Sequence, residues 1–178
     1  MMNDNLSKYY PCERIIDTKC NSEVDYWVQY RMQAENSDNG EIVPYLLDFM
    51  RTGRLWVTDI YPEMWANDHD KCHKFTSHQG IHINFQRISN TSVYVFLRDF
   101  ANTGEVMVIS GSYQENEIQS FDSRKLKLYR YFFNKLKDDL QFEIIEAPGL
   151  NGFFICHPGV SMDFSSLFNE YKTFKEKK

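Results

Sequence analysis

The stretch from Ile42 to Trp65 decides the fold, and it reads IVPYLLDFMRTGRLWVTDIYPEMW. Two apolar, aromatic-rich runs flank a short turn that contains Gly53, a pattern typical of a β-hairpin. Pro62 then ends the second strand and suits the first position of a helix, because proline has no backbone N–H to donate. We therefore predict a hairpin followed by a helical turn that carries Trp65, with His69 one turn further on the same face.

Length and composition indicate one aromatic-rich domain. The chain has 178 residues, of which 42% are hydrophobic and 16% aromatic, enough for one sizeable core. Aromatic side chains in such numbers either fill a core or line a pocket. The formal net charge of −5 excludes nucleic-acid binding by overall electrostatics. We therefore expect one domain that binds no nucleic acid by this segment alone.

The cysteines and the first residues bear on the cellular compartment. The four cysteines are irregularly spaced and form no Cys-x-x-Cys pair; they are Cys12, Cys20, Cys72 and Cys156. This spacing favours reduced thiols over a disulfide framework. The N-terminal residues lack the basic and apolar regions of a signal peptide, and no apolar run approaches the ~20 residues that span a bilayer. We expect a cytoplasmic protein with no membrane partner.

An arm and a helix are expected upstream of the hairpin. Residues 1–20 are mostly polar and are predicted to form an N-terminal arm. Ser22 suits a helix N-cap, and acidic residues follow in the first turn, where the helix dipole favours them. Apolar residues from Val24 to Met32 keep a roughly helical spacing. The predicted helix ends between residues 36 and 40.

Three strands are expected downstream of the hairpin, beyond a polar connector. Residues 81–86 alternate between apolar and polar side chains, as in a strand with one apolar face. Residues 93–100 and 106–109 are apolar on both faces, which is typical of strands covered on both sides. The joints between these segments are short. We therefore predict an antiparallel meander in which the two double-sided strands are central.

The remaining third of the chain contains two amphipathic segments and two short apolar runs. Asp122 can cap a long helix ending at residue 140, whose apolar stripe comprises Leu126, Tyr129, Phe132, Phe133, Leu136 and Leu140. Residues 142–145 and 153–155 predict two short strands, and residues 164–174 predict a last helix. We expect an α+β fold, an α/β/α sandwich with a central antiparallel sheet of about five strands, PAS- or GAF-like in type.

The order of these elements resembles a known family. The stretches that carry the resemblance are Tyr45-Leu46-x-x-Phe49-x-x-x-Gly53, Tyr61-Pro62-x-x-Trp65, Gly80-Ile81-x-Ile83 and Tyr129-x-x-Phe132-Phe133-x-x-Leu136. Together they resemble the autoinducer-binding domain of LuxR-type transcription regulators, over about two thirds of the chain. The resemblance implies a PAS-like ligand-sensing domain at residues 21–160, with quorum-sensing-like function, and an amphipathic helix or linker at 161–178. The helix-turn-helix domain of that family has no counterpart in this sequence.

The resemblance also implies a ligand site. In the family a Trp-x-x-x-Tyr pair and a downstream Asp bind an acyl-homoserine lactone. Trp65 stands at the Trp position, His69 replaces the Tyr, and no Asp suits the third position. We therefore expect a small amphipathic signal molecule that need not be such a lactone, and a domain that can form a homodimer. The predicted ligand-binding residues are Trp65, His69, Tyr45, Trp56, Tyr94 and Phe96.

Two other interpretations remain open at this stage. His69 and His73 are four residues apart and could share a metal on one helix face, but no closed Cys/His framework accompanies them. Cys72 beside His73 suggests a small enzyme working through the loop at 69–82, although no orienting acid or oxyanion motif is visible. A non-enzymatic protein-interaction module of PAS-like shape is the other alternative. We predict no cofactor, no metal and no catalytic residue.

Overall fold

The hairpin at the start of the decisive stretch is present and lies within a larger sheet. A computed structural model describes residues 8–19, 26–72, 80–101, 104–110, 124–147, 152–161 and 163–176. The strands are β1 (Cys12–Lys19), β2 (Tyr26–Glu35), β3 (Ile42–Thr52), β4 (Leu55–Pro62), β5 (Val106–Ser110), β6 (Glu143–Ala147) and β7 (Gly152–Cys156). The helices are the 3₁₀ helix η2 (Glu63–Trp65), α1 (His69–Cys72), α2 (Phe85–Asp99), α3 (Arg124–Leu140) and α4 (Phe164–Glu176).

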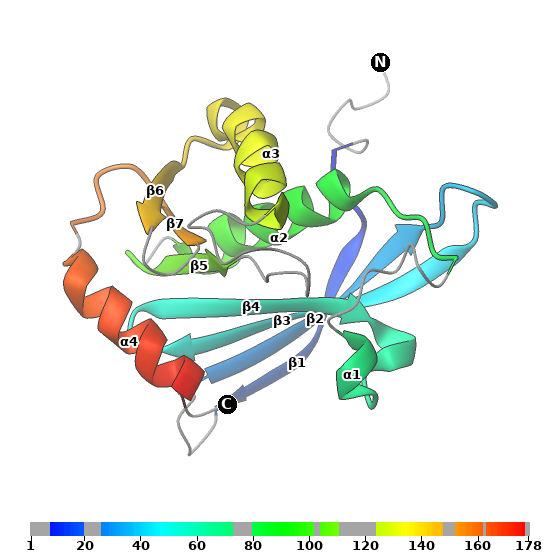
Figure 1. Ribbon diagram of the computed structural model, residues 1–178, viewed down its shortest axis with the longest axis horizontal. Helices are drawn as coiled ribbons and strands as arrows, with labels where there is room; N and C mark the ends of the chain where they lie inside the picture. The colour runs from blue at the N-terminus through cyan, green and yellow to red at the C-terminus, as the bar shows by residue number, and fades with distance from the viewer. Residues whose placement is uncertain are drawn as a thin grey trace.

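The seven strands form one open, mostly antiparallel sheet in an α+β fold (Figure 1). The strand order is β1-β2-β3-β4-β5-β7-β6, and every adjacent pair is antiparallel except β4 and β5, which are parallel. The helix α2 makes the crossover that this parallel pair requires. The predicted mainly antiparallel sheet is confirmed, whereas the prediction of about five strands was wrong because β1 and β2 were not recognised.

The hairpin has the predicted form. Residues from Tyr45 to Thr52 of β3 pair with β4 in continuous antiparallel register, ending at Thr52 opposite Leu55. Gly53 has a φ of 58°, a left-handed conformation that glycine adopts without a Cβ clash. Pro62 is the last residue of β4 and the N-cap of η2, so the helical turn begins one residue later than predicted.

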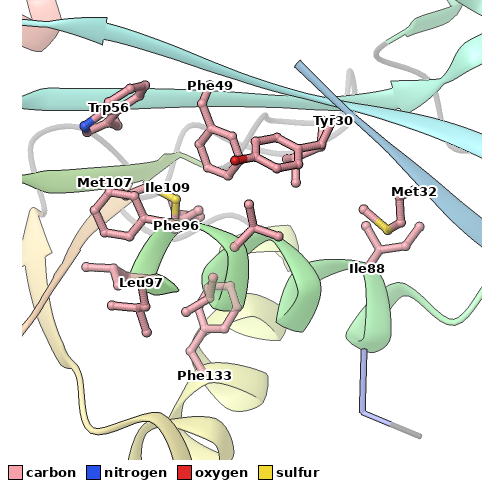
Figure 2. Close-up of a cluster of buried hydrophobic side chains, with 14 of the residues drawn as sticks. Tyr30, Met32, Phe49, Trp56, Ile88, Phe96, Leu97, Met107, Ile109 and Phe133 are labelled. Atoms are coloured by element: carbon pink, nitrogen blue, oxygen red, sulfur yellow. The ribbon is translucent and has the colours of Figure 1, made fainter. Parts of the chain in front are cut away.

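Helices cover both faces of the sheet (Figure 1). On one face, α2 and α3 bury a main core whose largest side chains include Tyr30, Phe49, Trp56, Phe96 and Phe133 (Figure 2). On the other face, α4 packs Leu167, Tyr171 and Phe174 against β4, β5 and β7 in a second core. No helix in the described ranges has the length and apolarity that crossing a bilayer would need.

The apolar stripe predicted for α3 is confirmed. Leu126, Tyr129, Phe133 and Leu136 are buried. The helix contacts α2, and the Phe133 ring meets the edge of Phe153 from β7 with centroids 5.7 Å apart. Through these contacts α3 closes the outside of the main core. The two short strands predicted after this helix are also present, as β6 and β7.

The predicted helix upstream of the hairpin was wrong, because these residues form β2. Val28, Tyr30, Met32 and Ala34 are buried at every second position, which is the period of a strand. Its β-branched and aromatic side chains suit a pleated surface. Apolar residues occur on both faces of this strand. Taken together, they produced the apparent helical spacing from Val24 to Met32. Of the residues expected in an N-terminal arm, 12–19 form β1 at the edge of the sheet.

The strands predicted at 81–86 and 93–100 were also wrong. Ile83 makes an isolated bridge to Asn36, and α2 begins at Phe85. The Asn84 side chain accepts a hydrogen bond from the Arg87 backbone N–H (3.0 Å), which caps the helix. Because α2 is enclosed between the sheet and α3, residues 88–97 are almost all buried, and residues 93–97 are apolar without interruption. Periodicity alone does not distinguish such a buried helix from a buried strand. The three-strand meander is therefore absent, and only β5 of its members is a strand.

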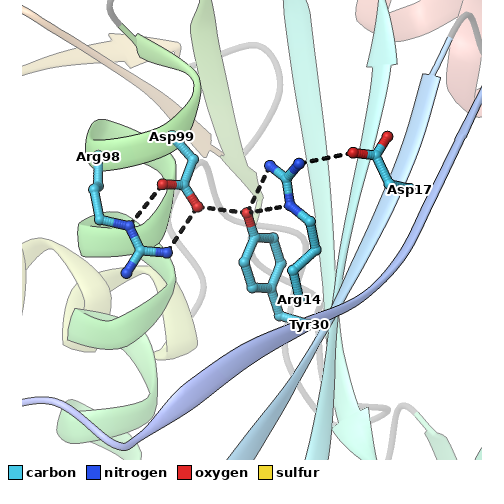
Figure 3. Close-up of polar contacts among 5 residues, drawn as sticks. All are labelled: Arg14, Asp17, Tyr30, Arg98 and Asp99. Carbon is cyan, nitrogen blue, oxygen red and sulfur yellow. Dashed lines mark hydrogen bonds and ion pairs between the residues drawn. The ribbon is translucent and has the colours of Figure 1, made fainter.

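A polar network fastens the edge strand β1 to α2 (Figure 3). The Tyr30 hydroxyl donates to Asp99 Oδ2 (2.5 Å) and accepts from Arg14 Nε (3.1 Å). Arg98 pairs with the same carboxylate (2.6 Å), and Arg14 continues to Asp17 (2.7 Å). The hydrogen bonds from Arg98 are the main reason that the pKa of Asp99 is lowered, and the bond from Tyr30 adds to the effect.

This lowered pKa predicts acid-sensitive stability. Since the folded-state pKa of Asp99 lies below its unfolded value of about 4, its ionised carboxylate stabilises the fold above that pH, and the contribution is lost as the pH falls. Asp99→Asn should therefore lower the free energy of unfolding at pH 7 and change it less at pH 3, as measured by urea denaturation. An equal effect of the substitution at both pH values would contradict this assignment.

Candidate functional site

The parallel strands β4 and β5 separate soon after they meet. Only Leu55, Trp56 and Val57 of β4 pair with β5, whereas β4 continues to Pro62. Within the described residues, no strand pairs with that edge of β4 beyond Val57. In open sheets with parallel strands, ligands bind outside the carboxyl ends of those strands. The carboxyl end of β4 is therefore a candidate position for a ligand site.

A cluster of polar side chains lies near this end, on the sheet face that points away from α2. Leu47 and Phe49 point into the main core, so Asp48 between them points to the opposite face. Asp48 Oδ1 accepts hydrogen bonds from Trp27 Nε1 (3.1 Å) and Gln29 Nε2 (2.8 Å), both from β2. Asp48 Oδ2 accepts one from the Tyr61 hydroxyl of β4 (2.6 Å). We name Trp27, Gln29, Asp48 and Tyr61 the Asp48 cluster.

The Asp48 cluster is shielded from water without being covered by a helix at its centre. Asp48 is 8% exposed and Gln29 7% exposed. Figure 1 shows α4 and α1 on this side of the sheet, near opposite ends of β4. Burial, followed by the hydrogen bond to Asp48, raises the pKa of Tyr61 above its ordinary value. Tyr61 therefore stays a neutral phenol that donates to a carboxylate.

The turn formed by η2 and α1 borders the cluster. Trp65 is buried, and its carbonyl oxygen accepts a hydrogen bond from the Cys72 thiol (2.9 Å). Burial is the main cause of the raised pKa of Cys72, and Asp68 and Asp59 contribute. The helix α1 contacts β4, and the Cys72 thiol adds to the raised pKa of Tyr61. A protonated thiol is a poor nucleophile at neutral pH, so this geometry does not favour the enzyme interpretation.

The structure brings two of the predicted ligand-binding residues to this end of β4. Tyr45 lies opposite Pro62 in the β3–β4 register, and Trp65 follows three residues later in η2. Both side chains are buried, and Tyr45 belongs to the main core. His69 begins α1, and its side chain lies outside the described part. A joint ligand-binding role for these residues stays a prediction.

The other predicted ligand-binding residues lie elsewhere. Trp56 is six residues from Pro62 along β4, about 20 Å away. Its ring stacks on Phe100 with centroids 4.2 Å apart, and its indole N–H donates to Glu105. Phe96 is fully buried in the same core. Tyr94 stacks on Tyr9 of the N-terminal segment with centroids 4.6 Å apart. These three side chains therefore have packing roles in the described structure.

The sequence did not predict the Asp48 cluster. Trp27 and Gln29 fell inside the wrongly predicted helix, and their partners lie about twenty and thirty residues downstream. The available signal was Asp48 itself, an acidic residue within the apolar run of β3. An ionisable residue at the centre of a buried strand needs partners, and such residues mark candidate functional sites.

The histidine-rich loop contributes no metal site within the described residues. No group of three His, Cys, Asp or Glu side chains there is arranged to hold a metal ion. His82 Nδ1 lies 2.6 Å from Asp38 Oδ2 in an exposed pair. His73 and His78 lie outside the described residues. Two surface cavities, of about 680 and 400 Å³, are lined by none of the six predicted ligand-binding residues.

Chemically, the Asp48 cluster offers a carboxylate acceptor, a phenol, an amide and an indole from three adjacent strands. Such a set can bind a polar head group by hydrogen bonds. No family model, curated protein or solved structure matches this chain. The case for a function therefore rests on the geometry of the site and on the pattern of the sequence.

Proposed function

We propose that this chain is a non-enzymatic signal-sensing domain of LuxR type that binds a small amphipathic molecule near the carboxyl end of β4. The observation that carries the proposal is the set formed by Trp27, Asp48 and Tyr61, joined by hydrogen bonds of 3.1 and 2.6 Å. An indole, a carboxylate and a phenol are the groups that the family resemblance assigns to the ligand's head group. They come here from different positions than the motif around Trp65 suggests.

The local chemistry supports recognition of a polar head with an apolar tail. Asp48 Oδ2 has one hydrogen bond, from Tyr61, and a carboxylate oxygen can accept two. A ligand N–H or O–H placed there would meet an acceptor that is held by three donors and is already shielded from water. The Trp27 ring beside it is an apolar surface for the ligand's tail. A few oriented polar groups beside apolar walls are typical of small-molecule sites.

The protonation of Tyr61 and of the neighbouring Cys72 supports a binding role. The pKa values of Tyr61 and Cys72 are both raised, so neither side chain is ionised near neutral pH. Either side chain would have to be deprotonated to act as a general base or nucleophile. A PAS- or GAF-like relationship of the sandwich is part of this proposal, with β1 and β2 extending the sheet on one side of the hairpin.

A second candidate function, a protein-interaction module, is favoured by the outer face of α3. Leu128 is 44% exposed and Tyr131 55% exposed, on one surface of that helix. Lys135 Nζ lies 4.2 Å from the Tyr131 ring centroid, so the surface is both aromatic and basic. Exposed apolar side chains next to one another mark contact surfaces. A homodimer or a protein partner would use this face and leave the Asp48 cluster free.

Native mass spectrometry of the protein purified from its own host distinguishes the two functions. We expect the wild type to retain a small molecule and the Trp27→Phe variant, which keeps the ring but loses the indole donor, to retain less of it. Tyr131→Phe, a conservative aromatic change on the exposed face of α3, is the control and should retain the wild-type amount. A wild-type protein that carries no small molecule but forms a dimer or holds a protein partner would favour the interaction module.

Calorimetric titration with a panel of acyl-homoserine lactones tests the ligand class. Since His69 stands where the family has Tyr, and the Asp48 cluster arises from other positions, we expect weak binding or none. Loss of a single hydrogen bond to a buried polar head costs about 1–3 kcal/mol. Submicromolar binding of any lactone in the panel would contradict the expectation of a different signal molecule.

A further inference from the structure

A cavity of about 680 Å³ lies at the opposite end of β4 from the Asp48 cluster. Three connections meet there: the β3–β4 turn with Arg54, the segment after α2 with Gly104, and the turn after β7 with His157, Gly159 and Ser161. From Arg54 to Tyr61 the strand spans about 23 Å, so the two sites are separate. The inference below does not depend on the proposed function.

Arg54 is held in place at the mouth of this cavity. Its Nη2 donates to the Gly104 carbonyl oxygen (2.6 Å), and its own carbonyl oxygen accepts from the Val106 N–H (3.0 Å). Arg54 is exposed, and no carboxylate of the described residues forms an ion pair with it. Only one of its five N–H donors is thus used, and the guanidinium keeps its full charge.

The nearby carboxylates do not neutralise Arg54. Glu105 accepts from Arg51 Nη1 (3.1 Å) and from the Trp56 indole, so it is engaged away from the cavity. Glu170 of α4 approaches Gly53 in the same turn, but it forms no ion pair with Arg54 and does not line the cavity. The charge facing the cavity within the described residues is therefore positive.

His157 lies across the cavity from the β3–β4 turn. Its Nε2 is buried and has no hydrogen-bond partner in the described part of the chain. The carbonyl oxygen of His157 accepts from the Val160 N–H (3.4 Å), which closes a turn through Pro158 and Gly159, the latter with a φ of 79°. Ser161, exposed, places a hydroxyl on the same rim. A buried imidazole nitrogen without a partner is rare and calls for an explanation.

We propose that this cavity binds the phosphate group of a small phosphate monoester, or free phosphate, between Arg54 and His157. A guanidinium presents paired N–H donors that match two phosphate oxygens. The Nε2–H of His157 donates once the imidazole ring turns from its buried position toward the cavity, and the Ser161 hydroxyl can donate to a third oxygen. The volume of about 680 Å³ exceeds what a phosphate group fills, which leaves room for the organic part of a monoester.

The test is a ¹H–¹⁵N NMR titration of the full chain at constant ionic strength. Three probes are used in separate arms: inorganic phosphate, glycerol 3-phosphate and acetate. We expect saturable shifts of the Gly104, Gly159 and Ser161 amides with both phosphates. Tighter binding of glycerol 3-phosphate than of phosphate would identify a monoester as the source, and equal binding would identify free phosphate.

Three variants distinguish a specific phosphate site from nonspecific attraction of phosphate by positive charge. Arg54→Gln should weaken phosphate binding about tenfold, because a hydrogen bond to a charged group is lost together with the charge. His157→Gln, which changes no backbone contact, should weaken it about threefold by the same reasoning. Lys127→Gln removes an exposed charge from α3 and should change it less than about twofold. Unshifted spectra with both phosphates, equal weakening in all three variants, or acetate binding as tight as phosphate would each overturn the proposal.

Discussion

Replacing Phe133 with Ala is expected to lower the free energy of unfolding by about 3–5 kcal/mol. The Phe133 side chain is fully buried on the inner face of α3. Its ring stacks on Tyr129 and meets the edge of Phe153, each with centroids 5.7 Å apart. The substitution leaves a cavity where α2, α3 and β7 meet, and the loss of aromatic contacts adds to the loss of buried area. Urea denaturation followed by circular dichroism measures the change.

Tyr131→Ala is the matched control for this substitution. It also removes an aromatic ring from α3, but the Tyr131 side chain is 55% exposed. Its expected effect is about 0.5–1 kcal/mol, because an exposed ring loses little buried area and only its contact with Lys135 is removed. A loss below about 1 kcal/mol for Phe133→Ala, or equal losses for the two variants, would show that α3 does not pack as described.

Replacing Asp48 with Ala is expected to lower the free energy of unfolding by about 2–4 kcal/mol. The carboxylate is the acceptor for Trp27 Nε1, Gln29 Nε2 and the Tyr61 hydroxyl. Each donor left buried without an acceptor costs about 1–3 kcal/mol, and water can reach Trp27 and Tyr61, which are partly exposed. The free energy of unfolding of wild type and variant in urea gives the difference.

Asp138→Ala controls for the loss of an acidic side chain as such. Asp138 is exposed near the end of α3, so its removal should change stability by less than about 0.5 kcal/mol. If Asp48→Ala were no more destabilising than this control, the three donors would have other acceptors, and the Asp48 cluster would not exist as described.

The parts of the fold that the sequence predicted correctly are those with local signals. The hairpin was predictable because Gly53 lies between two apolar runs, and the turn needs its positive φ. The α3 stripe was predictable because one side of that helix is exposed, so its apolar residues recur with the helical period. The strands β6 and β7 followed from short apolar runs bounded by turn residues.

The wrong predictions concern segments with apolar residues on more than one side. In such segments the spacing of apolar residues does not show whether the segment is a helix or a strand. The helix α2 is covered by the sheet and by α3, so residues 93–97 are apolar on all sides, and the segment 93–100 was predicted to be a strand. In β2, apolar side chains occur on both faces, as with Trp27 beside Val28, and the combined spacing imitates a helix. The parallel pairing of β4 with β5 depends on a crossover that the strand prediction at 93–100 excluded.

The candidate site was predictable only in part. The motif around Trp65 pointed to the same end of β4 as the Asp48 cluster, and the hairpin register places Tyr45 there. The Asp48 cluster depends on register between β2, β3 and β4, which sets Gln29 opposite Asp48 and Asp48 opposite Asp59. A one-residue change in register would turn Asp48 toward the main core. Because β2 was not predicted, no local sequence pattern indicated this register.

The indole region of a ¹H–¹⁵N NMR spectrum tests the central claim, ligand binding beside the Asp48 cluster, most directly. The chain has three tryptophans, and each indole N–H gives its own signal. Trp27 donates to Asp48, Trp65 borders the cluster, and Trp56 lies in the main core about 20 Å along β4. On titration with a small-molecule extract of the host cells, the account predicts shifts of the Trp27 and Trp65 signals and an unchanged Trp56 signal. A shift confined to Trp56, or three unchanged signals, would contradict it.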